Sequence, residues 1–141
     1  MPGGLDEAVH PRMRRQEILY RADTTIHFVI TEAVVRYLFC PREVMIAQLD
    51  RLVALSGLRT LRFGVVPFDV QYRFSPPHGF WIFDDKAVVV ETISAELTLT
   101  QPQEITQHLS AFERLAATAV YGTEARRLIT GVLDDAVEVL E

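Results

Sequence analysis

The chain has 141 residues, of which 49% are hydrophobic and 23% charged, and a formal net charge of −5 at pH 7. This length suits one globular domain with a buried core, and the composition excludes an intrinsically disordered chain. Because the apolar runs are far shorter than a membrane span and the first residues do not resemble a secretory signal, we expect a cytoplasmic protein that does not enter the membrane.

The charge is distributed unevenly along the chain. Residues 1–62 contain nine arginines against seven acidic residues, whereas residues 63–141 contain five basic and twelve acidic residues. A surface that binds nucleic acid concentrates positive charge against the phosphates. Only four arginines near the start of the chain approach this pattern, and a solvated helix face explains them equally well: Arg12, Arg14, Arg15 and Arg21. We therefore expect no independent binding to DNA.

The first part of the chain predicts a short leader, one helix and one strand. Residues 1–8 contain two adjacent glycines and no apolar period, which indicates a flexible leader before a single domain over residues 9–141. Charged and apolar residues then alternate at helical spacing over residues 12–21. Residues 25–30 are rich in β-branched and aromatic residues and predict a strand.

Two helices should follow this strand. The first runs over residues 31–39 and ends before Pro41, which restricts the residue that precedes it. The second begins at Pro41 and carries an apolar stripe as far as Gly57, which we predict to be a left-handed cap.

The middle of the chain predicts four strands, because β-branched and aromatic residues alternate there with turn residues. Asp84 and Asp85 stand between two of these strands and predict a tight hairpin turn. The expected strands cover residues 60–68, 79–84, 86–93 and 95–100.

The last third of the chain returns to helix. Apolar residues follow steps of four and three from Ile105 to Ala119, and again from Ala125 to Leu140 after a break at Gly122. The predicted order is therefore α-β-α-α-β-β-β-β-α-α. It indicates an α+β fold with a single mixed, mainly antiparallel sheet of about five strands covered by helices.

Five short segments occur in a characteristic order along the chain: Met13-Arg-Arg-Gln, Phe28-Val-Ile-Thr-Glu-Ala, Met45-Ile-Ala-Gln-Leu-Asp-Arg-Leu, Val65-Val-Pro-Phe and Val88-Val-Val-Glu. With these segments the chain resembles, from about Val9 to about Val132, the effector domain of antitoxin-like regulators of actinobacteria. These regulators are a branch of the xenobiotic-response-element repressors, and the domain follows their helix-turn-helix. The DNA-reading helices of such regulators precede the Arg-Gln pair. Because only a short stretch precedes that pair here, we expect the chain to lack its own DNA-binding domain.

The resemblance implies a domain of transcription regulation that senses a small molecule or binds a small acidic partner protein, and that acts as a dimer without a cofactor. An alternative is a free-standing small-molecule-binding protein or enzyme of a specialised-metabolite pathway that descends from such a domain. The apolar positions of the last helix predict Leu133 and Leu140 as a dimer interface, although the same helix could equally be buried in its own domain.

Catalysis and metal binding find little support in the sequence. The order of elements is reminiscent of phospholipase-D-like sensor domains, whose catalytic members need a lysine two residues after a histidine. Phe80 occupies that place after His78 here, so this chemistry is missing. None of the four histidines has metal-ligand spacing with a second histidine or an acid, and Cys40 is the only cysteine, so we predict no metal site and no catalytic residue. We leave enzymatic activity open and favour its absence.

The resemblance and the predicted elements select five polar residues in the first half of the chain as tentative ligand-binding residues: Arg15, Gln16, Glu32, Arg36 and Gln48. Arg15 and Gln16 match the family's Arg-Gln pair and could also close the first helix against the domain. Glu32 could simply favour the positive end of a helix. Gln48, which we expect among apolar residues, needs hydrogen-bond partners from the sheet or from a ligand.

Three further tentative ligand-binding residues lie among the predicted strands: His78, Trp81 and Glu91. Glu91 follows three valines, and a carboxylate in a central strand needs a partner such as Arg15 or Arg36. Trp81 should face away from Phe80 and line either a pocket or a partner surface, with core packing as the simpler interpretation.

Overall fold

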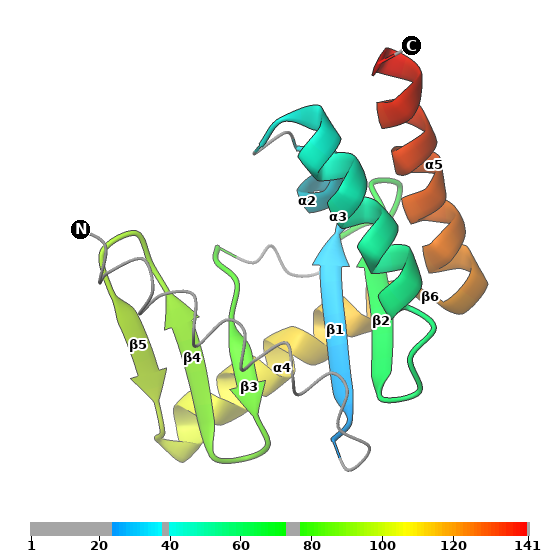
Figure 1. Ribbon diagram of the computed structural model, residues 1–141. Coiled ribbons are helices and arrows are strands. Elements are labelled where there is room, and N and C mark those ends of the chain that lie inside the picture. Colours follow the sequence, from blue (N-terminus) through cyan, green and yellow to red (C-terminus); the bar gives the residue numbers. More distant parts are fainter. Residues whose placement is uncertain (1–23, 38–39, 73–76, 141) are drawn as a thin grey trace. The chain divides into compact units, whose positions relative to one another are not determined.

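The computed structural model describes residues 24–37, 40–72 and 77–140, and the predicted leader and first helix, with Arg15 and Gln16, lie outside these ranges. The chain divides into two compact units (Figure 1). Residues 1–67 and 120–141 form the first unit, and residues 68–119 form the second unit. Each unit is described by itself.

The first unit contains a three-stranded sheet in the order β1-β2-β6. Strands β1 (Ile26–Thr31) and β2 (Leu61–Val66) are parallel, whereas β6 (Val120–Tyr121) pairs with β2 in the antiparallel direction. Parallel neighbours require a long crossover connection. Helices α2 (Glu32–Arg36) and α3 (Arg42–Leu55) supply it.

The ends of these helices follow from their flanking residues. Thr31 precedes α2, and its hydroxyl accepts a hydrogen bond from the backbone N–H of Val34 at 3.4 Å. Helix α3 ends at Leu55, and the next residue, Ser56, has right-handed helical dihedrals and donates its backbone N–H to the carbonyl of Leu52. The prediction of a left-handed cap at Gly57 is therefore wrong, since the positive φ angles among the described residues belong to Asp84 and Gly122.

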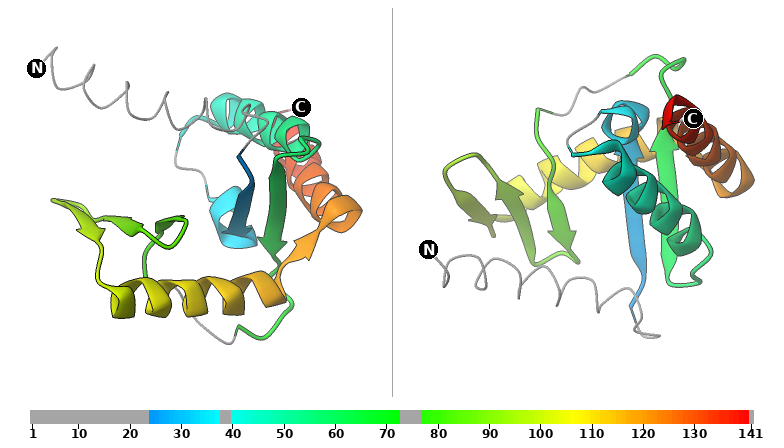
Figure 2. Two further views of the ribbon diagram at one scale, coloured as in Figure 1. Left: turned by 90° about the horizontal axis from the view of Figure 1, so that it is seen from below. Right: turned by 45° about the horizontal axis from the view of Figure 1, so that its top comes forward.

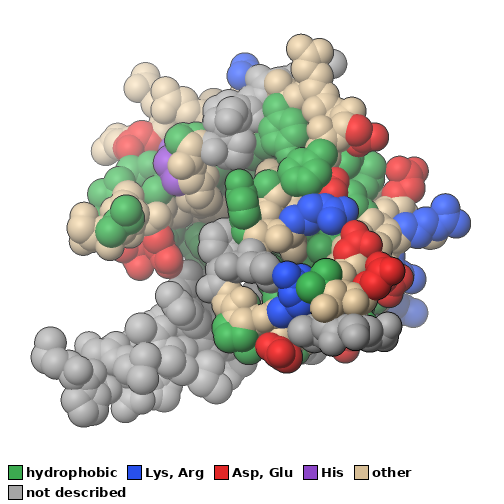
Figure 3. All heavy atoms as spheres, turned by 90° about the horizontal axis from the view of Figure 1, so that it is seen from above, with side chains coloured by type: hydrophobic (Ala, Val, Ile, Leu, Met, Phe, Trp, Pro, Cys, Tyr) green, Lys and Arg blue, Asp and Glu red, His purple; other side chains and the backbone are tan. Residues whose placement is uncertain are grey.

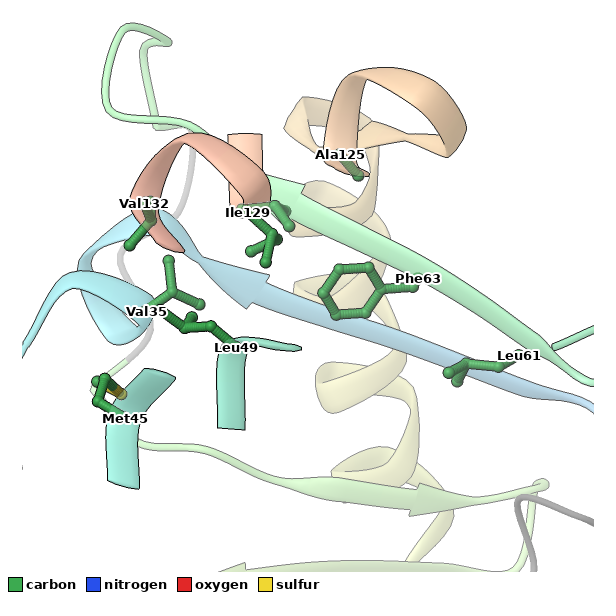
Figure 4. Packing of buried hydrophobic residues seen from close by; sticks show 9 residues of the cluster. Val35, Met45, Leu49, Leu61, Phe63, Ala125, Ile129 and Val132 are labelled. Atoms are coloured by element: carbon green, nitrogen blue, oxygen red, sulfur yellow. The ribbon is translucent and has the colours of Figure 1, made fainter. Parts of the chain in front are cut away.

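The core of the first unit lies between its sheet and the helices α3 and α5 (Gly122–Leu140), which lie next to each other (Figure 2). Leu49 of α3 and Ile129 of α5 are each only 1% exposed. The apolar stripe predicted for the last helix is thus confirmed as a core-facing surface. Figure 4 shows the side chains that meet there: Val35, Met45, Leu49, Leu61, Phe63, Ala125, Ile129 and Val132.

The second unit contains an antiparallel sheet in the order β3-β4-β5 and one long helix, α4 (Pro102–Thr118). The strands are β3 (Trp81–Phe83), β4 (Ala87–Glu91) and β5 (Glu96–Leu99). The predicted hairpin turn is confirmed, because Asp84 has a φ of 54° and Lys86 donates its N–H to the carbonyl of Phe83 at 3.0 Å. Alternate residues of β4 meet α4 in a small core of Val88, Val90 and Ile105.

The α+β class predicted from the sequence is confirmed. The single sheet of about five strands is a correction, because the described residues form two separate sheets of three strands each. The additional strand β6 is only two residues long. No helix in the described part of the chain is long and apolar enough to cross a membrane.

Candidate functional site

A group of polar side chains lies on the face of the sheet β1-β2-β6 opposite its apolar core. Successive side chains of a strand point to opposite faces. Because Phe28 and Phe63 pack into the core, their neighbours His27 and Arg62, which are register partners, belong to the other face. Tyr121 shares this face, since it pairs with the residue two positions after Arg62. We call these residues the His27–Arg62–Tyr121 cluster.

The three side chains contact one another closely. The Nε2 atom of His27 lies 2.8 Å from the hydroxyl oxygen of Tyr121, which is hydrogen-bond distance, and the two ring centroids are 5.5 Å apart. The guanidinium carbon of Arg62 lies 4.4 Å from the centroid of the Tyr121 ring, which is a favourable cation–π distance. The tyrosine therefore holds the imidazole with its hydroxyl and the guanidinium with its ring.

Gly64 makes room for this arrangement. A Cβ atom at position 64 would lie 2.5 Å from Cε1 and 2.9 Å from Cζ of Tyr121, both well inside van der Waals contact. The absence of a side chain thus lets the aromatic ring lie against the backbone of β2.

The environment keeps His27 and Tyr121 uncharged at neutral pH. Burial, and to a lesser degree the positive charge of Arg62, lowers the pKa of His27 below 6.5. Burial raises the pKa of Tyr121 above 10.0, although Arg62 opposes this shift. The only full charge of the cluster at pH 7 is therefore the guanidinium of Arg62.

Arg62 is exposed, and the ion pairs of the described residues involve Arg36 rather than Arg62. A guanidinium offers parallel N–H donors that match a carboxylate or a phosphate. The tyrosine hydroxyl and the imidazole are bonded to each other, and the raised pKa of Tyr121 disfavours a phenolate nucleophile. The cluster is thus suited to binding an anion rather than to catalysis.

A family model for a domain of unknown function (DUF5753) matches residues 2–131. The chain belongs to this family. No curated protein and no solved structure matches it. The region matched by DUF5753 contains all four residues that build the site: His27, Arg62, Gly64 and Tyr121.

Two of the predicted site residues of this DUF5753 chain, Glu32 and Arg36, are brought together as an ion pair. Arg36 donates from Nε to the Glu32 carboxylate at 2.6 Å, and its Nη1 lies 3.4 Å from Oδ2 of Asp135 in α5. The bond to Glu32 raises the pKa of Arg36, and partial burial opposes this shift. Glu32 is 9% exposed. The geometry indicates a structural role that joins α2 to α5.

The other predicted residues of the DUF5753 domain have more varied surroundings. Gln48 is exposed on α3 while Met45 and Leu49 are buried, so the expectation that its amide lies among apolar residues is wrong. The buried face of α3 covers a smaller part of the helix circumference than the apolar stripe in its sequence indicates, so Gln48 is exposed to solvent. Leu133 is partly buried against the core of the first unit, and the side chain of Leu140 lies outside the described part.

The three predicted residues of the second unit occupy its surface. Trp81 is 45% exposed while Phe80 packs against the small core, so the two face opposite ways as predicted. Glu91 ends the central strand β4, where it is exposed and pairs in register with Glu96. The predicted central position of this strand is confirmed, and the partner expected for the carboxylate stays a prediction. His78 is exposed beside the rings of Phe80 and His108.

Sequence reasoning did not select His27, Arg62, Gly64 or Tyr121. The sequence did contain a signal, because one polar residue stands between two apolar residues in Ile26-His27-Phe28 and again in Leu61-Arg62-Phe63. That pattern places both side chains on the outer face but does not reveal that Tyr121 joins them. The pairing of β2 with β6 decides this, and it connects distant parts of the chain.

Proposed function

We propose that this domain is the ligand-sensing part of an antitoxin-like transcriptional regulator, and that the His27–Arg62–Tyr121 cluster binds a small anionic molecule. The observation that carries this proposal is the exposed guanidinium of Arg62, which lies 4.4 Å from the Tyr121 ring centroid. The sequence resemblance to effector domains supports the regulatory context.

The charge balance of the cluster favours an anion over a neutral or cationic ligand. Because His27 is neutral and Tyr121 is protonated, the positive charge of Arg62 is not neutralised within the cluster. A carboxylate or phosphate ester would form charge-assisted hydrogen bonds with the guanidinium, which are stronger than bonds between neutral groups. Figure 3 shows one face on which acidic and basic side chains of the described residues lie side by side, and this mixture does not suit DNA.

The location of the cluster suits sensing, because its members belong to three different strands. His27 lies on β1, Arg62 on β2 and Tyr121 on β6. Strand β6 continues directly into α5, and β1 continues directly into α2. A ligand that bridges these side chains would therefore stabilise the positions at which both helices begin.

Calorimetry after a thermal-shift screen of carboxylates, phosphate esters and nucleotides tests the proposal. A ligand at a hundred times its Kd should stabilise the native state by about 2.7 kcal/mol. Arg62→Gln should abolish the effect and Tyr121→Phe should weaken it. Arg59→Gln removes an exposed arginine just before β2 and serves as the matched control, which should respond like the wild type.

A ligand whose neutral amide or ester analogue binds equally well would contradict an anion site, as would binding that persists in Arg62→Gln. For the regulatory role, transcript profiles of cells that carry Arg62→Gln should differ from the wild type in the same genes as a deletion of the whole gene. Identical transcript profiles of the wild type and the deletion strain would contradict the regulatory role.

A further inference from the structure

We propose that His78 and His108 of the second unit together bind one divalent transition-metal ion of the kind that imidazole prefers, such as Zn²⁺, Cu²⁺ or Ni²⁺. His78 precedes β3, whereas His108 lies in α4. Their ring centroids are nevertheless only 6.3 Å apart, with the ring planes inclined at 32°.

The hydrogen bonds of both rings show which ring nitrogen carries a proton. Nδ1 of His108 lies 2.8 Å from the carbonyl oxygen of Glu104, and Nδ1 of His78 lies 3.0 Å from the carbonyl oxygen of Gly79. Because a carbonyl oxygen can only accept, each Nδ1 must carry the proton and donate it. In the neutral rings, each Nε2 therefore retains its lone pair.

This pattern is the one found in metal-binding histidines. Such residues usually donate their second ring nitrogen to a carbonyl or a carboxylate, which fixes the tautomer and the ring orientation before the metal arrives. Here a backbone carbonyl fixes the tautomer of both histidines, and in the half-buried His108 it fixes the ring orientation as well.

Phe80 holds the two rings near each other. Its ring meets that of His108 edge-on at 5.2 Å between centroids and that of His78 edge-on at 6.2 Å. Phe80 itself packs against the core of the second unit. Since His108 is half-buried in a helix and His78 is exposed, one ligand has a fixed position and the other has space to rotate.

The separation of the rings is compatible with a shared ion. With Zn–N distances of about 2.0–2.1 Å, two imidazoles on one ion have centroids roughly 6.5 Å apart in a linear N–Zn–N arrangement and roughly 5.2 Å apart in a tetrahedral one. The observed 6.3 Å is close to the linear value, so the His78 ring would rotate towards His108 to reach a tetrahedral angle at the metal. No group of three or more potential metal ligands occurs among the described residues. Water or a small exogenous ligand would therefore complete the coordination.

Calorimetric titration of the tag-free full chain with zinc chloride tests the proposal. We expect one ion per chain at this site. His78→Ala and His108→Ala should each lower the affinity about a hundredfold, because chelation by two linked ligands is lost. The double variant should lose less affinity than the two single losses together predict, because each single substitution already breaks the chelate.

Gln107→Ala, an exposed change beside His108, is the matched control and should leave the affinity unchanged. In the electron paramagnetic resonance spectrum of the Cu²⁺ complex, the wild type should show coupling to two imidazole nitrogens. His78→Ala should show one fewer, and far-UV circular dichroism would verify that this surface variant is folded. Undiminished zinc binding in both single variants, or losses that simply add in the double variant, would overturn the shared site.

Discussion

Tyr121 occupies its place in the His27–Arg62–Tyr121 cluster because residue 64 has no side chain. Its ring covers the backbone of β2 at Gly64, while its hydroxyl lies 2.8 Å from Nε2 of His27. A side chain at position 64 would have to displace an aromatic ring that is also held by Arg62. The glycine is therefore part of the site although it offers no functional group.

Gly64→Ala should lower the free energy of unfolding by about 1 kcal/mol or more, because the added methyl group overpacks against the ring. Urea denaturation measures this loss. In a Tyr121→Ala background the same change should be neutral or stabilising by up to about 1 kcal/mol, since alanine is better tolerated than glycine within a strand. An equal loss in both backgrounds would show that the ring is not the cause.

The histidine of the cluster should make the stability depend on pH. The pKa of His27 in the folded state is below its ordinary value of 6.5, mainly because of burial and also because of Arg62. As the pH falls, the unfolded chain binds this proton first. The contribution of His27 is therefore fully present above pH 6.5 and is lost as the pH falls through the folded-state pKa.

His27→Gln should consequently reduce the fall in unfolding free energy between about pH 7 and about pH 5. Urea denaturation of wild type and variant at the same series of pH values measures this difference. The carboxylates contribute equally to the pH dependence of both proteins, so their contribution cancels in the comparison. A variant with the same or a steeper pH dependence would rule out a neutral histidine in the folded state.

The helices and strands show which features a sequence can predict. The stripe of α5 was predictable because helical periodicity is a local property, and Ala125, Ile129 and Val132 are indeed buried. The hairpin turn at Asp84 was predictable for the same reason. The cap at Gly57 and the strand β6 were not. Helix α3 is followed by Ser56 in a right-handed helical conformation, so it needs no left-handed cap at Gly57. Strand β6 has only two residues, which is too short to show an alternation of apolar and polar side chains.

The site was less predictable than the fold class. Glu32 and Arg36 were selected separately, and the helical spacing of four residues brings them together. By contrast, neither the partnership of His27 with Tyr121 nor that of His78 with His108 follows from local spacing. Both depend on how distant elements pair, which a single sequence does not specify.

The exposed side of α5 gives a sharper test of self-association than the predicted interface does. Leu133 is partly buried in its own core, so Leu133→Glu would destabilise the fold itself. Val139 is 66% exposed and apolar. If α5 contacts a second copy, this valine is available to do so.

Val139→Glu should convert a dimer into a monomer while changing the unfolding free energy of the monomer by no more than about 0.5 kcal/mol. Size-exclusion chromatography with light scattering measures the first quantity, and urea denaturation at low concentration measures the second. Val139→Ala is the matched control, because it shortens the side chain without introducing a charge. A wild type that remains monomeric at high concentration would exclude dimerisation through α5.

At the scale of the whole molecule, the two units differ in the size of their cores. Among the residues that the structure describes, the buried cluster of the first unit has nine members, whereas that of the second unit has three. The stability of a small unit is marginal when little apolar surface leaves water. The second unit should therefore open more easily than the first.

Hydrogen exchange followed by mass spectrometry should show faster exchange for the amides of β4 than for those of β2, although each is the central strand of its sheet. Val88→Ala should accelerate exchange in the second unit and leave β2 almost unchanged. Equal protection of both strands, before and after this substitution, would show that the chain opens as one cooperative unit.

The antiparallel pairing of β2 with β6 indicates that the second unit can be deleted from the chain. The chain leaves the first sheet after Val66 and returns at Val120, and Val65 and Val120 are register partners. Cα atoms paired in this way are about 4.5–5.5 Å apart. Residues 68–119 therefore have the topology of an insertion at the tip of a β-hairpin. A short turn of the Asn-Gly type could close the gap, which makes the second unit removable and exchangeable as a cassette.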